Sequence, residues 1–168
     1  MISAKTLAEE VKVMNVNNSV TIYDVADWFL SKESMTPKKL QKLCYYYKAW
    51  GLALYDEDLL PGYEFEAWVH GPVNPELYSM FKGYLWKDIP QERDNSRLFN
   101  EKELELLESV WYTYGELTAN AIEAVTHTEE PWRKARGKLD EFAACNNIIN
   151  HDDMKNFYRK LHEENQGE

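Results

Sequence analysis

The sequence predicts a mainly α-helical fold class, a single compact helical domain with a small β element. Apolar residues recur at spacings of three and four over most of the chain, a pattern typical of amphipathic helices. Several of these segments begin with Thr or Asn in the position of a helix N-cap. One short stretch alternates apolar and polar residues with period two, as a strand does. The length of 168 residues favours one domain.

The first two helices are predicted from their starting residues. Thr21 and Asp24 have the spacing of a capping box, for a helix that runs to about residue 33. Thr36 followed by Pro37 marks the start of a longer helix, because Pro suits the first helical position. We expect the lysines of this helix and Gln41 to point mostly away from its buried face. That face is predicted to carry Leu40, Leu43, Cys44, Tyr47, Gly51 and Leu54.

The stretch EFEAWVHGPVNPELY predicts a strand, a turn and a new helix. Residues 65–69 alternate between apolar and mixed positions, which favours a short strand. Gly71 and Pro72 are predicted to end it. Asn74 and Pro75 then have the pattern of an N-cap and a first helical residue.

The second half of the chain is predicted to add further short helices. Residues 86–98 have the composition of a loop, and helices are predicted to start at Asn100, Thr118 and Asn150. A turn through Pro131 and Trp132 leads into one more short helix. Ile148 and Ile149 are the candidate for a second strand.

The boundaries of the domain follow from these patterns. Residues 1–20 are polar and weakly periodic, so we expect a weakly structured lead-in. The domain is predicted to span residues 21–162, and residues 163–168 are expected to fray.

Composition and charge narrow the function classes. Hydrophobic residues make up 44% of the chain, enough for a core. No run approaches the roughly 18 apolar residues of a membrane span, and the N-terminus lacks a signal-peptide pattern, so we expect a cytoplasmic protein without a membrane partner. The formal net charge of −10 argues against direct nucleic-acid binding, which needs clustered Lys and Arg.

Residue patterns for catalysis, metals or cofactors are weak. The seven glycines form no phosphate-binding loop, and the histidines lack metal-ligand spacing, so we predict no cofactor and no metal. Cys44 and Cys145 form no CxxC pair, and a free thiol is the expected state of Cys44. His70 is the best catalytic candidate, because it precedes a turn and is flanked by aromatic residues. Its structural alternative is a ring that hydrogen-bonds the turn backbone.

Four segments occur in this order along the chain: TPKKLQKLCYYYKAWGLALY, FEAWVHGPVNPELY, THTEEPWRKAR and IINHDDMKNFY. Together they resemble the Panacea-domain family, which includes SocA-like antitoxins and GepA-like phage-associated proteins. The resemblance covers roughly residues 20–160. Tyr47 departs from the family, which often has a small residue there. The resemblance implies a structural role for Leu40, Lys42, Leu43, Trp68, His70, Gly71, Pro72, Pro75, His127, Pro131 and Trp132.

The resemblance also implies a binding domain rather than an enzyme. Its partner would be a cognate protein toxin, one that acts on RNA or translation, neutralised by direct stoichiometric contact. The acidic charge agrees, since it complements a basic toxin. Candidate contact residues are Glu64, Glu66 and Trp68, with Tyr45 and Tyr46 as outward tyrosines. A homo-oligomer stays open.

Two other functions also stay open. One is a phage-associated accessory protein that binds a host defence or regulatory factor, or that presents a partner to a protease. The other is a hydrolase that uses His70 and a neighbouring acid. A small toxic reading frame beside the gene would favour the antitoxin.

Overall fold

Seven α-helices and one two-stranded sheet make up residues 20–167, the part of the chain that the computed structural model describes. In chain order the elements are α2 (Ile22–Lys32), α3 (Pro37–Tyr55), β1 (Glu66–Trp68), β2 (Gly71–Val73), α4 (Pro75–Phe81), α5 (Glu101–Tyr114), α6 (Ala119–Thr128), α7 (Glu130–Arg136) and α8 (His151–Gln166). The mainly α-helical fold class is confirmed. The lead-in predicted for residues 1–20 lies outside the described residues, apart from residue 20.

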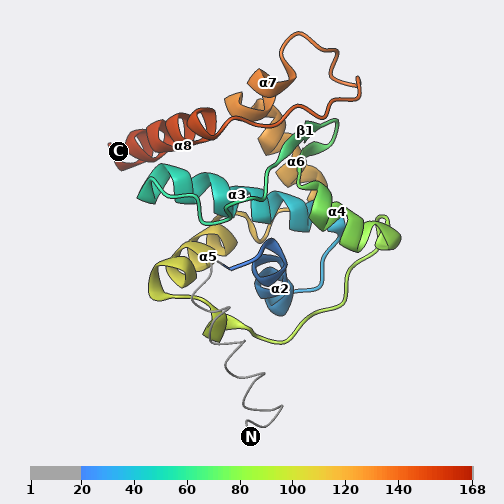
Figure 1. The fold of residues 1–168 in the computed structure, drawn as a ribbon, viewed down its shortest axis with the longest axis vertical. Coiled ribbons are helices and arrows are strands. Elements are labelled where there is room, and N and C mark those ends of the chain that lie inside the picture. Colours follow the sequence, from blue (N-terminus) through green and yellow to red (C-terminus); the bar gives the residue numbers. More distant parts are fainter. Residues whose placement is uncertain (1–19, 168) are drawn as a thin grey trace, which may run out of the picture.

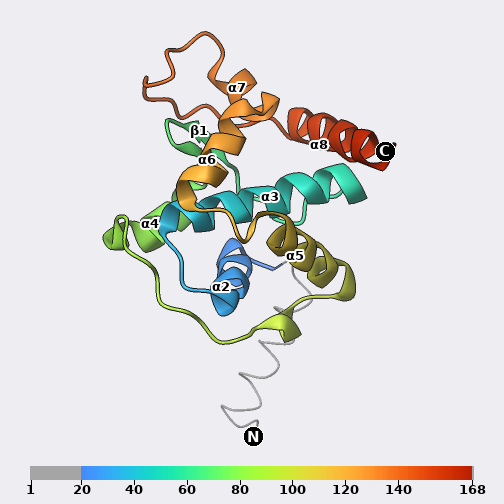
Figure 2. The same ribbon diagram turned by 180° about the vertical axis from the view of Figure 1, so that it is seen from behind.

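The long helix α3 runs through the middle of the fold. Helix α8 lies along one side of it, and α5 and α2 lie along the other (Figure 1). The view from behind shows α6 crossing α3 on the side away from α4 (Figure 2). Because residues 39–49 are all buried, this part of α3 is an internal helix rather than a surface helix with one buried stripe.

The predicted capping residues start the helices. Thr21 with Asp24 and Asn100 with Glu103 form complete capping boxes, in which each partner's side chain accepts the other's backbone N–H. The remaining predicted caps each accept a hydrogen bond from the N–H three residues further on: Thr36, Asn74, Thr118 and Asn150. Local sequence therefore sets where these helices begin.

More of α3 is buried than the face that its sequence predicts. Leu40, Leu43 and Tyr47 have no exposed surface, as predicted. Leu54 is 39% exposed, so its predicted burial is wrong. The expectation that the polar residues point away from the core is also wrong for Lys39, Gln41, Lys42 and Lys48, which are all buried. Each of these four donates to at least one backbone carbonyl, which compensates for its burial.

The sheet is a tight hairpin. The predicted strand at residues 65–69 is confirmed in shorter form as β1, and β2 pairs with it in antiparallel register, with Glu66 opposite Val73 and Trp68 opposite Gly71. The predicted second strand at Ile148 and Ile149 is wrong in extent, because Ile148 forms only an isolated bridge, to Glu66. Gly71 and Pro72 are predicted to end the strand, but β1 already ends at Trp68 and these two residues begin β2.

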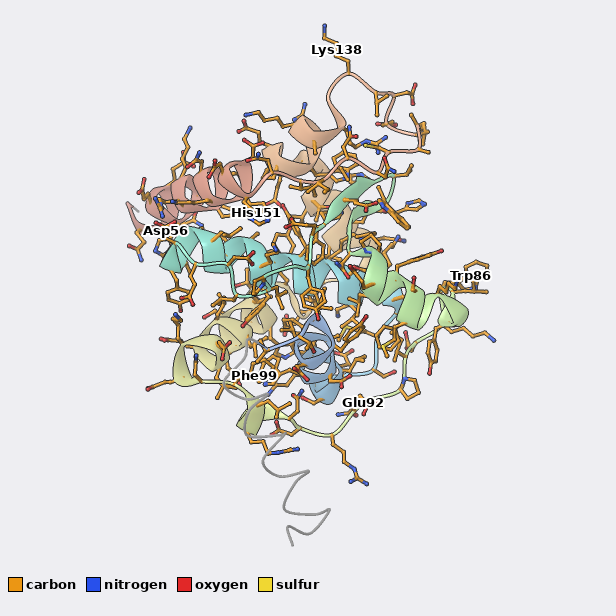
Figure 3. All side chains as sticks on the ribbon, in the orientation of Figure 1. Asp56, Trp86, Glu92, Phe99, Lys138 and His151 are labelled. Atoms are coloured by element: carbon orange, nitrogen blue, oxygen red, sulfur yellow. The ribbon has the colours of Figure 1, made fainter. Side chains whose placement is uncertain are left out.

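The connection from α4 to α5 wraps around the outside of α2. Trp86, Glu92 and Phe99 mark its course in Figure 3. Short 3-10 turns occur at Lys82–Tyr84 and Ser96–Leu98, and the rest has the irregular backbone predicted for residues 86–98, apart from an isolated bridge between Met35 and Ile89.

The last helix continues further than predicted. Helix α8 extends to Gln166, so the frayed tail expected from residue 163 is wrong for residues 163–166. Met154 and Tyr158 are completely buried and anchor α8 against the rest of the fold. None of the helices in residues 20–167 is long and apolar enough to cross a membrane.

Candidate functional site

The β1–β2 hairpin rests on the buried side chain of Lys42 from α3. The Lys42 ammonium donates to the Pro72 carbonyl at 3.1 Å, and only 1% of the residue is exposed. Gly71 has φ +101°, and a Cβ there would lie 2.5 Å from Cε of Lys42. Only glycine therefore fits both the backbone angle and the space above the lysine. Desolvation lowers the pKa of Lys42 to about 7, although the nearby Glu123 carboxylate opposes this shift.

Residues of α6 and α7 hold the hairpin from a second side. The Trp132 indole donates to the Trp68 carbonyl at 2.8 Å, and the Arg136 guanidinium donates to the Ala67 carbonyl at the same distance. The His127 ring stacks on Trp132 with ring centroids 4.1 Å apart. Burial lowers the pKa of His127, which favours a neutral ring in this stack.

The chain leaves the hairpin through a fixed corner at Asn74. Its backbone N–H and C=O exchange two hydrogen bonds with the side-chain amide of Gln41, at 2.9 and 3.1 Å. Its side chain caps α4 by accepting from the Leu77 N–H and also donates to the Glu64 carbonyl. Pro75 then occupies the start of α4. The corner is a scaffold whose polar groups are satisfied internally.

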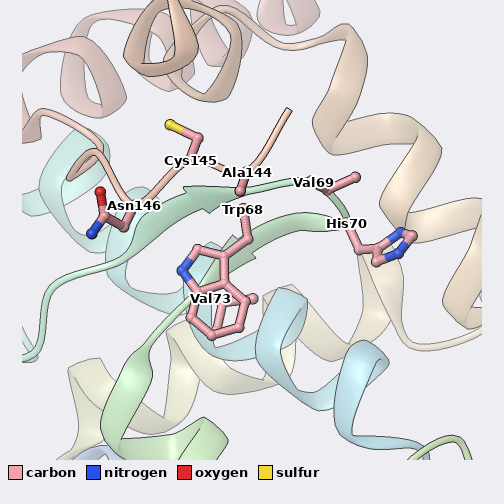
Figure 4. Close-up of a pocket in the computed structure, with 7 residues that line it drawn as sticks. All are labelled: Trp68, Val69, His70, Val73, Ala144, Cys145 and Asn146. Atoms are coloured by element: carbon pink, nitrogen blue, oxygen red, sulfur yellow. The ribbon is translucent and has the colours of Figure 1, made fainter. Parts of the chain in front are cut away.

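The outer face of the hairpin opens onto a groove of about 480 Å³. The hairpin forms one wall, and the extended segment at residues 144–146 forms the other (Figure 4). The lining residues are Trp68, Val69, His70, Val73, Ala144, Cys145 and Asn146. Apolar side chains dominate this set, and the histidine lies at the turn end of the groove.

Trp68 is the largest side chain on this face. It is half-buried, its indole N–H donates to the Glu66 carboxylate at 2.9 Å, and its ring lies 4.9 Å from the ring of Tyr78. Residues that pair across a sheet point to the same side, so Val73 and Ile148 share this face with Glu66. The face therefore combines an aromatic pair and apolar side chains with a carboxylate.

His70 lies on the surface at the tip of the hairpin. Its side chain is 74% exposed, and its Nδ1 lies 2.6 Å from a carboxylate oxygen of Glu123. The ring thus pairs with an acidic side chain, and the predicted hydrogen bond to the turn backbone is not the contact that forms. A histidine beside a carboxylate is one half of a general-base arrangement. Among residues 20–167, no group of three His, Cys, Asp or Glu is arranged to hold a metal ion.

A comparison with known families decides which family this is. The family described as "Antitoxin SocA-like, Panacea domain" matches residues 40–133, more than half of the chain. The chain belongs to the SocA-like Panacea family. No curated protein and no solved structure matches it. The matched region of this Panacea domain runs from early α3 to the middle of α7, and it contains the hairpin together with most of the residues that hold it.

The structure brings many of the predicted motif residues of this Panacea domain into one cluster. Lys42, Gly71, Pro72, Trp68, His127 and Trp132 all meet at the hairpin. Leu40 and Leu43 lie apart from it, in the core between the helices, and Pro131 is buried at the start of α7. The helical pattern predicts that Lys42 points away from the buried face, while the family resemblance implies a structural role. Its place under the hairpin is known only from the fold.

The outward placement of Tyr45 and Tyr46 is wrong. Neither residue has any exposed surface. The three tyrosines 45–47 cover about 200° of the helix circumference, since each residue turns the helix by about 100°. Neighbours surround α3, so all three are buried, and Tyr46 stacks on Tyr114 at 3.9 Å. They belong to the core of this Panacea domain and offer no surface to a partner.

A buried carboxylate organises this tyrosine cluster, and sequence reasoning missed it. One oxygen of Glu129 accepts from the hydroxyls of Tyr46 and Tyr158, at 2.7 and 2.9 Å. The hydroxyls of Tyr45 and Tyr158 also lie 3.1 Å apart. Burial raises the pKa of Glu129, while the two tyrosine hydrogen bonds act in the opposite direction. The sequence signal was small, because Glu129 precedes a Pro-Trp pair and has the pattern of an exposed turn residue.

Proposed function

We propose that this Panacea domain is an antitoxin that acts in the cytoplasm, where it neutralises a cognate protein toxin by direct stoichiometric contact. The observation that carries the proposal is the family match over residues 40–133. Residues of the matched region support the hairpin. Lys42 lies below the hairpin and Trp132 lies beside it. Such a support fits a scaffold whose outer face is free to suit one partner.

The hairpin face is the surface we assign to the partner. Trp68 and Tyr78 supply aromatic contact area, and Glu66 supplies negative charge beside them. Glu64 is half-exposed and pairs with His151 at 2.7 Å, so it belongs to the rim of this face. A toxin that acts on RNA or translation would be basic, and the chain's charge of −10 would speed its association.

Titration of the purified protein against its toxin tests the proposal. The toxin would be the product of a toxic reading frame beside the gene, assayed by inhibition of cell-free translation. We expect rescue to saturate at a fixed molar ratio and to follow the appearance of a complex on a sizing column. Rescue by a small substoichiometric amount, with the toxin left chemically modified, would instead indicate an enzyme and refute the proposal.

A matched pair of variants tests the assigned surface. Trp68→Ala should weaken the complex by about 2 kcal/mol or more, as truncation of a central aromatic anchor does. Tyr112→Ala removes an aromatic side chain that is 90% exposed on α5, and it should leave binding unchanged. Circular dichroism of both variants would check that the fold is intact. Equal affinities for the two variants would remove the hairpin face from the interface.

A further inference from the structure

One wall of the groove has backbone N–H groups that make no hydrogen bond within the described chain. The segment that follows α7 pairs with the β1 region at two points, where Asn147 accepts from the Ala67 N–H and Ile149 donates to the Phe65 carbonyl. Within the described chain, the backbone N–H groups of residues 144–146 make no hydrogen bond of this kind. Unpaired backbone at the edge of a sheet pairs readily with an extended chain.

The floor of the groove suits an apolar side chain. Trp68 and Val73 form the hairpin side of it, and Ala144 lies on the opposite side (Figure 4). Burying apolar surface against such a floor stabilises a complex in proportion to the area removed from water. The shape and the open backbone together fit a short extended peptide better than a helix.

The two ends of the groove differ in charge. At the Trp68 end, the Glu66 carboxylate accepts the indole N–H, and no Lys, Arg or His nitrogen of residues 20–167 lies within ion-pair distance of it. At the turn end, Glu123 is paired with both His70 and Lys38, at 2.6 and 3.3 Å. The unpaired charge is therefore on Glu66, where a basic side chain would find a partner.

We propose that this groove binds an extended segment of a protein partner, with an apolar side chain against Trp68 and a Lys or Arg beside it at Glu66. The backbone of the segment pairs with residues 144–146 and lies between the two walls. This rests on the proposed antitoxin function, in which the segment belongs to the toxin. It narrows the partner to a protein that exposes a short extended stretch with an apolar residue next to a basic one.

The Ala144→Trp variant blocks the groove with a bulky side chain. Ala144 lines the groove and is exposed, so the larger side chain would fill the space between the two walls. A library of random twelve-residue peptides would be selected on the full native chain, and the binders would then be measured on the native chain and on the variant. Ser109→Trp, which adds the same side chain at an exposed position of α5, is the control. Circular dichroism of both variants would check that the fold is intact.

The selected peptides decide the proposal. We expect them to share an apolar residue next to Lys or Arg, and to bind the Ala144→Trp variant at least about tenfold more weakly. Glu66→Gln should weaken them roughly two- to fivefold, as loss of an exposed ion pair does. Glu101→Gln, which removes an exposed charge on α5, should leave binding unchanged. Peptides that bind the native chain and the Ala144→Trp variant equally, or that are insensitive to Glu66→Gln, would overturn the proposal.

The selection requires no toxin, so the two proposals can fail separately. Groove-specific peptides together with no toxin neutralisation would overturn the antitoxin function alone. Neutralisation by the Ala144→Trp variant that is as effective as that by the native chain would overturn the groove as the contact site and leave the antitoxin function standing.

Discussion

Replacing Lys42 with Met should change how the stability of this protein depends on pH. Burial under the hairpin lowers the pKa of Lys42 from 10.5 to about 7, and the attraction of Glu123 recovers only part of that loss. Between these two values the unfolded chain holds a proton on Lys42 that the folded chain has released. Folding stability therefore rises with pH across this window, since the unfolded state binds more protons there.

The expected size follows from the shift. Each pH unit in which only the unfolded chain is protonated raises the free energy of unfolding by about 1.4 kcal/mol. Near pH 7 the folded chain is still partly protonated on Lys42, so the slope there is smaller. The free energy of unfolding therefore rises by roughly 2 kcal/mol between pH 7 and pH 9. The Lys42→Met variant has no group that titrates at this position, so its stability would lack this rise. The substitution would also leave the Pro72 carbonyl without its donor, which costs about 1–3 kcal/mol at every pH.

Urea unfolding at pH 7, 8 and 9, followed by tryptophan fluorescence, measures the free energy of unfolding at each pH. Burial raises the pKa of the Cys44 thiol, which lowers stability as the pH rises above 9. Cys44 is present in every protein compared, so its effect cancels in the difference between the free energies of unfolding of the native protein and the variant. That difference is the quantity to follow. The exposed Lys87, replaced with Met, is the matched control and should show the pH dependence of the native chain.

Parallel plots of stability against pH for the native protein and Lys42→Met would refute this reasoning. If the difference between the native protein and Lys42→Met stays constant within about 0.5 kcal/mol from pH 7 to pH 9, Lys42 titrates alike in the folded and unfolded chains. The lysine would then be hydrated in solution, and its place as the dry support of the hairpin would be wrong.

Three further substitutions test the packing, each measured by chemical unfolding. Gly71→Val should destabilise the fold by more than about 2 kcal/mol, because φ is +101° and the new Cβ would meet Lys42; an unchanged midpoint would show that the turn rearranges freely. Leu43→Ala should cost about 2–5 kcal/mol as a buried truncation, and a cost below about 1 kcal/mol would contradict its place in the core. Trp132→Phe keeps an aromatic ring but removes the donor to the Trp68 carbonyl, so a loss of about 1–3 kcal/mol is expected. A neutral result there would mean that water replaces the indole.

The parts of the fold that could be predicted depend on neighbours in sequence. A capping residue such as Thr21 or Asn100 bonds to a backbone group three residues away, so a short stretch contains all the information needed. The start of β1 follows from alternation in the same way. The end of α8 could not be predicted, because the burial of Tyr158 by distant parts of the chain extends a helix whose last turns are polar.

The site is less predictable, because its contacts join distant segments. A helical periodicity argument assumes one buried face, and α3 has neighbours all around, so the argument places Tyr45 and Lys42 outside when both are buried. Gly71 and Pro72 have the pattern of a terminator in sequence. Their place in β2 depends on a lysine about thirty residues earlier and on α6, which local patterns do not contain.

The contact between Tyr158 and Glu129 bears on how this protein can be shortened. The family signature stops at residue 133, before α8 begins. Yet the Tyr158 hydroxyl fills one of the two hydrogen bonds on a buried carboxylate, and α8 covers a large part of α3. A gene trimmed to the signature would expose an apolar helix and leave that carboxylate short of a donor. We therefore expect the segment that matches the family to be too short to fold alone, and a transferred domain to need its last helix as well.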